Sequence, residues 1–244
     1  MTGWLVVVGL GPGDDGLITP EVRAALDTAT DVVGYIPYVA RIAPRAGLTL
    51  HASDNRVELD RAAHALRLAA SGARVAVVSS GDPGVFAMAS ALFEALEAAP
   101  EHLGLDIRIL PGITAMLAAS ARAGAVLGHD FCAINLSDNL KPWAVIERRL
   151  RLAAQADFAM AFYNPRSASR PGQFARVLDV LRQECGAARL ITFARAVTTP
   201  EEELRTMTLD EALPEMADMR TVVLLGNSAT RRVGRFVYTP RRAE

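Results

Sequence analysis

The stretch that decides the fold is LVVVGLGPGD, residues 5–14. A run of β-branched apolar residues is typical of a buried strand, and the glycines that follow are typical of a tight turn. Similar short apolar runs recur along the chain, where they alternate with longer Ala-, Leu- and Arg-rich stretches of helical period. This alternation predicts an α/β protein whose strands are joined through helices.

Two series of alternating elements are present, which predicts two α/β lobes. The first series comprises strands 4–9, 31–35, 74–79 and 106–110 and helices 20–29, 57–71 and 85–98. The second series comprises the segments 131–136, 143–154, 158–162, 174–182, 190–194 and 221–225. We expect the boundary near Ala115, which gives lobes 1–115 and 116–244. A single sheet with many strands is the alternative, and residues 231–244 form either a tail or a final strand.

The composition indicates an ordinary globular protein. The chain has 244 residues, 51% of them hydrophobic, and a formal net charge of −1. This balance argues against a disordered chain and against a nucleic-acid-binding protein, which usually carries a basic excess. Two cysteines that stand far apart imply neither a disulfide framework nor a thiolate metal site. Because no apolar run reaches membrane-spanning length, we expect a soluble cytoplasmic protein, and we expect no metal site.

The first glycine-rich turn is similar to half of a dinucleotide-binding fingerprint. That fingerprint requires a third glycine three positions after the second, where this chain has Asp14. Pro12 also removes a backbone N–H where a pyrophosphate needs donors. The acidic residue expected at the end of the second strand is instead Asp31, at its start. These departures disfavour a nicotinamide-dependent oxidoreductase, and a plain tight turn explains the glycines equally well.

Two further glycine-bearing loops follow predicted strands of the first lobe. They are SSGDPG, residues 79–84, and PGITA, residues 111–115. Loops at the carboxyl ends of parallel strands form the ligand sites of open α/β sheets. Asp82 either accepts hydrogen bonds from a ligand or starts the next helix, and Thr114 either contacts a ligand or caps a helix. Because all three loops should converge on one edge of the sheet, their joint occurrence favours a binding site.

Polar and aromatic clusters follow other predicted strands. SDNLKPW, residues 137–143, and FYNPRS, residues 162–167, lie in the second lobe, and YIPY, residues 35–38, ends a strand of the first. The polar clusters indicate either a ligand site or ordinary turn chemistry, since Asp and Asn before Pro also favour turns. The aromatic pair either stacks on a flat ligand or covers the edge of a core.

Taken together, the three glycine loops resemble those of the tetrapyrrole methyltransferase superfamily, and they occur in its order. These loops are residues 9–14, 80–86 and 111–115. Within the superfamily, three more segments look like those of members that methylate precorrin-3B at C17 in cobalamin biosynthesis. These segments are residues 34–38, 137–143 and 162–167. The resemblance extends from about Val6 to Thr230, nearly the whole chain.

The resemblance implies a class III methyltransferase fold, in which S-adenosylmethionine lies in a cleft between two α/β lobes, and usually a homodimer. The cofactor-binding residues that it implies are Pro12, Gly81, Asp82, Thr114, Ala115, Phe162, Tyr163, Asn164, Ala196 and Gly226. The substrate-binding residues that it implies are Tyr35, Tyr38, Ser137, Asp138, Asn139 and Lys141. Gly226 matches the family pattern more loosely than the other residues do.

The implied reaction methylates C17 of precorrin-3B and contracts the ring to give precorrin-4. Methyl transfer needs alignment more than a strong base. Ring contraction also requires an oxygen of the substrate to lose or shift a proton, for which Asp138 or Tyr35 is a candidate general acid or base. Lys141, the only lysine, is the candidate for stabilising an oxyanion or pairing with a substrate carboxylate. The arginines beside these loops are either further carboxylate contacts or solvated surface residues, and they are Arg41, Arg45, Arg56, Arg166 and Arg170.

Three alternatives remain open on the sequence alone. The nearest is another member of the superfamily, one that uses the cobalt-containing precorrin or methylates a different ring carbon. The second is a nicotinamide-dependent oxidoreductase, and the third is a non-catalytic tetrapyrrole carrier on the same scaffold. We expect a tetrapyrrole as the partner, and neither a nucleic acid nor a membrane.

Overall fold

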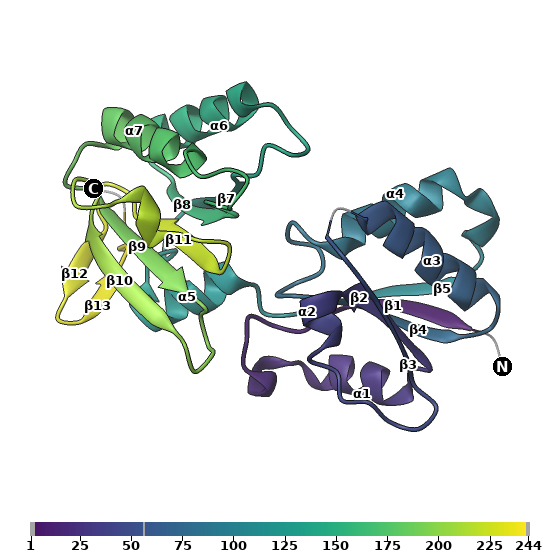
Figure 1. Cartoon of the computed structure of the whole chain (residues 1–244). Helices are drawn as coiled ribbons and strands as arrows, with labels where there is room; N and C mark the ends of the chain where they lie inside the picture. Colours follow the sequence, from purple (N-terminus) through teal and green to yellow (C-terminus); the bar gives the residue numbers. More distant parts are fainter. Residues whose placement is uncertain (1–2, 56, 243–244) are drawn as a thin grey trace. The chain divides into compact units, whose positions relative to one another are not determined.

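Two compact units, Met1–Thr114 and Ala115–Glu244, make up the chain. The computed structural model in Figure 1 describes residues 3–55 and 57–242. Each unit contains its own five-stranded sheet, so the alternative of one long sheet is wrong. The hydrophobic cores are separate as well, since two clusters of buried residues lie in the first unit and one lies in the second. Among the described residues, no helix is long and apolar enough to cross a bilayer.

The sheet of the first unit is entirely parallel, with the strand order β3-β2-β4-β1-β5. Its strands are β1 (Trp4–Gly9), β2 (Asp31–Tyr35), β3 (Thr49–Ser53), β4 (Arg74–Ser79) and β5 (Asp106–Leu110). Its helices are α1 (Pro20–Thr28), α2 (Ile36–Val39), α3 (Glu58–Ala70) and α4 (Met88–Ala98), with the short 3₁₀ turns η1 (Asp15–Leu17) and η2 (Pro100–His102). Because all strands run the same way, the loops after β1, β4 and β5 leave from one edge.

Helices cover both faces of this sheet, as Figure 1 shows. Leu5 and Val7 of β1 pack with α3 and α4, whereas Val6 and Val8 pack with α1 and α2 on the other face. Successive residues of a strand point to opposite faces, and a strand that is buried on both faces is an unbroken apolar run. The apolar run in the opening stretch is therefore that of a central strand.

The sheet of the second unit is mixed, with the strand order β10-β9-β11-β8-β7. Its strands are β7 (Phe131–Asn135), β8 (Ala159–Tyr163), β9 (Leu190–Arg195), β10 (Glu203–Thr208) and β11 (Thr221–Leu225). β7 and β8 are parallel, and β11 runs antiparallel to both β8 and β9. Consequently β7, β8 and β9 end at the same edge of the sheet, and β11 begins there.

A small three-stranded sheet completes the second unit. It is formed by β12 (Arg231–Val233), β13 (Phe236–Tyr238) and β6 (Gly124–Ala125). β12 and β13 are an antiparallel pair, so the final segment of the chain is not a simple tail. The helices of the unit are α5 (Ala115–Ala123), α6 (Trp143–Gln155) and α7 (Gln173–Cys185), with the 3₁₀ turn η3 (Pro214–Met216).

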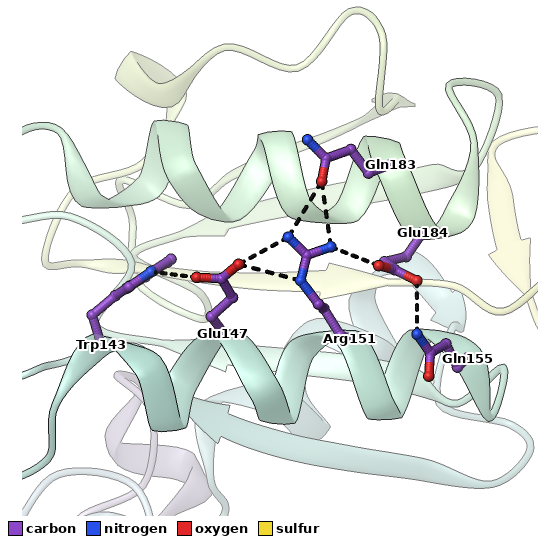
Figure 2. Close-up of polar contacts among 6 residues, drawn as sticks. All are labelled: Trp143, Glu147, Arg151, Gln155, Gln183 and Glu184. Atoms are coloured by element: carbon purple, nitrogen blue, oxygen red, sulfur yellow. Dashed lines mark hydrogen bonds and ion pairs between the residues drawn. The ribbon is translucent and has the colours of Figure 1, made fainter.

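A polar network joins α6 to α7, as Figure 2 shows. Arg151 of α6 lies 2.8 Å from a carboxylate oxygen of Glu147 and 2.6 Å from one of Glu184 on α7. Glu147 also accepts from Nε1 of Trp143 at 2.9 Å, and Glu184 accepts from Nε2 of Gln155 at 3.1 Å. Both helices also contribute to the hydrophobic core of the unit. Apolar burial stabilises the contact between α6 and α7, and it is not directional. The polar network therefore fixes the orientation of the two helices in that contact.

Candidate active site

The three glycine loops of the first unit meet at one edge of its sheet. Gly11 and Gly81 exchange two backbone hydrogen bonds, with N–O distances of 3.2 and 2.9 Å. The N–H of Gly112 donates to Oδ2 of Asp82 at 3.1 Å. The loops after β1, β4 and β5 are thus directly connected, which confirms the predicted convergence.

Glycine is required at this junction because backbone packs against backbone. A Cβ atom on Gly9 would lie 2.5 Å from the carbonyl oxygen of Gly81. A Cβ atom on Gly112 would collide with the same oxygen. Gly11 has a φ of +68°, in the left-handed region that L side chains rarely adopt. The loops can approach this closely only because no side chain stands between them.

Asp82 holds the second and third loops together. Its Oδ1 accepts the N–H of Gly84 at 2.8 Å, and its Oδ2 accepts the N–H of Gly112. The interpretation that Asp82 and Pro83 start the next helix is wrong, since α4 begins only at Met88. A carboxylate oxygen accepts more than one hydrogen bond, so this geometry leaves Asp82 able to bind a ligand as well.

The first loop suits a ligand without phosphate groups better than a dinucleotide. Pro12 is partly buried and offers no N–H, and Asp14 accepts the N–H of Gly16 at the start of η1. An NH2 group of Arg41 donates to the carbonyl oxygens of Leu10 and Gly13 at 2.9 and 3.0 Å. The guanidinium of Arg41 therefore binds the main chain of the first loop, and its presence does not indicate a phosphate site. A pyrophosphate site needs main-chain donors in this position.

Other candidate arginines also contact backbone, and one candidate lies outside the described residues. Arg45 donates to the carbonyl oxygens of Leu26 and Ala29 at the end of α1, at 2.9 and 2.6 Å. Nε of Arg166 donates to the carbonyl oxygen of Pro171 in the same loop at 3.1 Å. Arg56 is the candidate outside the described residues. The predicted role of these arginines as substrate contacts stays a prediction.

Tyr35 and Tyr38 lie together at the end of β2. Their ring centroids are 5.4 Å apart and their planes are at 86°, an edge-to-face pair. Burial raises the pKa of Tyr38, and the neighbouring phenol of Tyr35 raises it further. The phenol of Tyr38 therefore keeps its proton at neutral pH, where it can donate a hydrogen bond.

Sequence reasoning missed Arg61, a buried cation of α3 that is 4% exposed. Its Nε donates to Oγ of Ser53 at 2.8 Å, and an NH2 group donates to the carbonyl of Asp54 at 2.6 Å. Burial lowers its pKa, and interactions with Glu58 and with the phenols of Tyr38 and Tyr35 raise it. A cation inside a helical pattern of alanines and leucines carries no distinctive local signal, so only the structure reveals it.

In the second unit, the ends of β7 and β8 are joined by a partly buried amide pair. Oδ1 of Asn135 accepts the N–H of Ser137 at 2.9 Å and the Nδ2 group of Asn164 at 3.1 Å. Asn135 is the last residue of β7, and Asn164 follows β8 directly. One acceptor therefore connects the two predicted site loops. Asn135 was not among the predicted site residues, because it lies inside the strand pattern.

Three non-glycine residues near this edge have left-handed backbone conformations. The φ angles of Asn164, Ala196 and Thr198 are 52°, 47° and 68°. Asn tolerates this region, but a β-branched residue such as Thr rarely adopts it. Such strain costs roughly 1–3 kcal/mol per residue and persists where the surrounding structure imposes it, often at functional sites. The strain supports this edge as a candidate site independently of the sequence motifs.

The structure brings some predicted cofactor residues together. The backbone N–H of Met116 donates to Oη of Tyr163 at 3.0 Å, so Tyr163 lies beside the start of α5, where Ala115 is the first residue. Phe162 is fully buried, and its side chain lies in the core of the second unit. Thr114 is buried as the last residue of the first unit.

Gly226 lies apart from the other predicted residues of the second unit. It follows β11, which runs antiparallel to β8 and β9, and its N–H donates to the carbonyl of Leu190 at the start of β9. Phe162 and Ala196 stand at the other edge of the same sheet. A Cβ atom on Gly226 would collide with the side chain of Thr230, so this glycine is explained by its own turn.

The loop after β7 carries the remaining predicted substrate residues. The carboxylate of Asp138 is 42% exposed, and Nε of Arg170 lies 3.9 Å from it. The N–H of Asn139 donates to Oγ of Ser137 at 3.4 Å. Burial lowers the pKa of Lys141, so its ammonium releases a proton more readily than that of an exposed lysine. A carboxylate and a perturbed amine on one loop can exchange protons with a bound ligand.

Comparison with known proteins identifies the class. Residues 4–213 match the Tetrapyrrole (Corrin/Porphyrin) Methylases, and the chain belongs to this family of methyltransferases. A relative in Sinorhizobium sp, the precorrin-3B C(17)-methyltransferase, is 51% identical over 247 residues, with 99% of this chain and 97% of the relative covered. The predicted family is therefore confirmed.

Solved structures agree with this assignment. The crystal structure of the methyltransferase CobJ matches with a TM-score of 0.96 and 75% identity, covering 98% of this chain and 100% of that one. The uroporphyrin-III C-methyltransferase of Thermus thermophilus, complexed with S-adenyl homocysteine, shares the fold with a TM-score of 0.66 at 23% identity, covering 92% of each chain. The predicted α/β tetrapyrrole methylase fold is confirmed.

Proposed function

We propose that this methyltransferase methylates precorrin-3B at C17 and that ring contraction to precorrin-4 follows, as a step of cobalamin biosynthesis. The observation that carries the proposal is the 51% identity, over nearly the full length of both chains, to a protein named for that reaction. The segments 137–143 and 162–167, which single out this reaction in the sequence, follow the adjacent parallel strands β7 and β8. Their proximity supports a shared role.

The methyl donor in this proposal is S-adenosylmethionine. A family member of the same fold is complexed with the demethylated form of this molecule. The main chain of Gly81, the carboxylate of Asp82 and the residues Pro12, Thr114 and Ala115 would bind it, together with Phe162 (through its backbone), Tyr163, Asn164 and Ala196. Glycine loops without a phosphate cradle suit a sulfonium cofactor that carries no phosphate. We leave Gly226 out of this set because it lies at the opposite edge of its sheet.

The substrate residues in this proposal are Tyr35, Tyr38, Ser137, Asp138, Asn139 and Lys141. S-adenosylmethionine, when bound, would supply an electrophilic methyl group to C17 and would keep the electron pair of the broken bond on its sulfur. The macrocycle gains a positive charge, which it loses when the carboxylate of Asp138 accepts a proton from its oxygen function, while Tyr35 is the candidate general acid. Tyr38 donates a hydrogen bond through its protonated phenol, and Lys141 pairs with a carboxylate or a developing oxyanion.

Incubation of the purified chain with precorrin-3B and S-adenosylmethionine tests the function. We expect a mass gain of one methyl group, formation of S-adenosylhomocysteine and the absorbance change of ring contraction. Bound but unaltered precorrin supports a carrier, and tight NADPH binding without methyl transfer supports an oxidoreductase. A parallel incubation with the cobalt-containing substrate shows which form is used, since faster turnover there supports the alternative reaction.

Exchange of Asp138 for Asn tests the proton-transfer role. The amide keeps the size of the side chain but cannot accept a proton at neutral pH, so Asp138→Asn should lower turnover by roughly 10²–10⁴-fold. Asp130→Asn is the matched control, because Asp130 is an exposed carboxylate at the other end of β7. Stopped-flow absorbance with precorrin-3B measures both variants. Equal turnover of the two variants would remove Asp138 from the mechanism.

We also propose that the chain is a cytoplasmic homodimer. The free thiols of Cys132 and Cys185 support a reducing compartment, and the family resemblance supports the dimer. Light scattering during size-exclusion chromatography measures the mass in solution. Twice the mass of the chain supports the dimer, and a single-chain mass contradicts it.

A further inference from the structure

One arginine of the loop after β8 reaches the loop after β7, and these two loops carry proposed residues of the second unit. The side chain of Arg170 is 11% exposed. Its NH1 group donates to the carbonyl oxygen of Asn164 at 3.2 Å and to Oε1 of Gln173 at 2.9 Å. Its Nε lies 3.9 Å from Oδ1 of Asp138. A nearly buried guanidinium therefore contacts the loop after β8 and the loop after β7 at once.

Gln173 extends this connection. It is the first residue of α7 and is 7% exposed, so both ends of its amide need partners. The oxygen accepts from Arg170, and Nε2 donates to the carbonyl oxygen of Leu136 at 2.5 Å. Leu136 directly precedes the loop that carries Asp138. Arg170 thus reaches that loop by two routes, one electrostatic and one through the buried amide.

The chemistry of the guanidinium explains why arginine stands at this position. Its five N–H groups lie in a fixed plane and can satisfy several acceptors in different directions. A lysine offers one compact ammonium on a flexible stem, which cannot span the same set of acceptors. A nearly buried permanent cation also favours a carboxylate nearby, and Asp138 is its ion-pair partner among the residues that the structure describes.

We propose that Arg170 is a positioning residue for the methyl-transfer site: it fixes the loop that carries Asp138 relative to the loop that carries Asn164. This inference rests on the proposed function. In this role Arg170 acts through protein groups, which differs from both alternatives that the sequence left open, a substrate carboxylate contact and a solvated surface residue.

Replacement of Arg170 by Lys tests the proposal, and Arg182→Lys is the matched control. Arg182 stands near the other end of α7 and donates to the carbonyl oxygens of Leu209 and Ala212 at 3.0 and 2.7 Å. Each substitution removes a guanidinium that bridges two segments, but only one bridge touches the proposed site. Thermal unfolding, calorimetric titration with S-adenosylhomocysteine and turnover of precorrin-3B are measured for both variants.

We expect Arg170→Lys to lower kcat by roughly 10- to 100-fold and to weaken S-adenosylhomocysteine binding, because misplaced site groups cost rate and affinity. Its melting temperature should fall no more than that of Arg182→Lys, whose kcat should stay near the wild-type value. In the Asp138→Asn background, the additional loss of kcat from Arg170→Lys should be much smaller, since one route runs through Asp138. The proposal would be overturned if the fold losses of kcat from Arg170→Lys and Asp138→Asn multiply fully in the double variant. It would also be overturned if Arg170→Lys and Arg182→Lys have the same kcat and the same affinity for S-adenosylhomocysteine.

A second variant covers the case in which Arg170→Lys does not fold. Gln173→Leu breaks the amide route while leaving the guanidinium and Asp138 in place, and it should lower kcat in the same direction by a smaller factor. If Gln173→Leu keeps the wild-type kcat and the wild-type affinity for S-adenosylhomocysteine, this result would count against the positioning role of Arg170. Absence of wild-type turnover would instead remove the proposed function. The titrations with S-adenosylhomocysteine would then still decide whether Arg170 orders the loop of Asn164.

Discussion

Gly112 illustrates how the absence of one side chain shapes the candidate site. A Cβ atom there would collide with the carbonyl oxygen of Gly81 and approach Gly9, both of which are backbone and cannot rotate away. The constraint is steric and local. It therefore gives a prediction at the scale of a single residue.

Gly112→Ala should lower the free energy of unfolding by about 1–3 kcal/mol, the usual cost of overpacking, and should also weaken S-adenosylhomocysteine binding. Gly104→Ala is the control, since a Cβ atom at Gly104 would meet nothing within 4 Å. Urea denaturation and calorimetric titration measure the two effects. If both alanine variants are equally stable, the three loops are not packed as tightly as described.

At the scale of elements, a chain of polar side chains links β2, β3 and α3. Oδ1 of Asp31 lies 2.8 Å from Nε2 of His51, whose Nδ1 lies 3.2 Å from Nε2 of His64. Burial lowers the pKa of His64, and the charges of His51 and Arg67 lower it further, whereas Asp31 opposes them. Folding therefore favours the neutral ring of His64.

This arrangement should make the protein less stable in mild acid. The pKa of His64 is lower in the folded state than in the unfolded state, where it is about 6.5. The contribution of His64 to the free energy of unfolding is therefore complete above the unfolded-state pKa and is lost as the pH falls through the folded-state pKa. Urea denaturation between about pH 7.5 and pH 5 should show a steeper loss of stability for the wild type than for His64→Gln. His102→Gln, a substitution in η2 away from this chain of side chains, should keep the wild-type slope. An unchanged slope for His64→Gln would contradict the prediction.

The sequence predicted central elements better than edges. The central strands at 4–9, 31–35, 74–79 and 221–225 have the predicted bounds, and so does the edge strand at 106–110. β3 and β10 were not predicted, because both are edge strands with several exposed side chains and no continuous apolar run. The one-turn helix α2 was also missed, since its proline and tyrosines indicate a turn rather than a helix.

The candidate site was predictable where its residues form compact motifs. The glycine loops converge because parallel strands must end together, which is a rule of sheet topology. Arg41 binds the first glycine loop, Arg61 binds the segment after β3, and Arg170 links the loop after β8 to Asp138, each through carbonyl groups or side chains distant in sequence from the arginine or several residues away. Such contacts leave no pattern in the sequence around the arginine itself. Sequence alone does not give the direction of β11, so it could not show that Gly226 and Ala196 stand at opposite edges of the sheet.

At the scale of the whole molecule, each unit has its own sheet and its own core. Domains built in this way can fold separately. Residues 1–114 and 115–244, expressed as separate chains, should therefore each unfold cooperatively in thermal denaturation followed by circular dichroism. An unfolded product from either half would contradict the independence of the cores.

Neither half should bind S-adenosylhomocysteine with the affinity of the full chain, because the proposed cofactor residues come from both units. Calorimetric titration of the two halves and of the full chain measures this. Full affinity in one half alone would confine the cofactor site to that unit and would remove the other unit's residues from the proposal.

Lys141 has a practical consequence for the study of this enzyme. It is the only lysine of the chain, it lies on the loop after β7, and burial lowers its pKa. A larger fraction of its amine is therefore unprotonated in mildly alkaline buffer than would be so for an exposed lysine. Apart from the α-amino group, whose pKa is about 8, Lys141 is the only amine that an acylating reagent can modify, so a fluorophore or crosslinker can be attached beside the candidate site without first removing competing lysines.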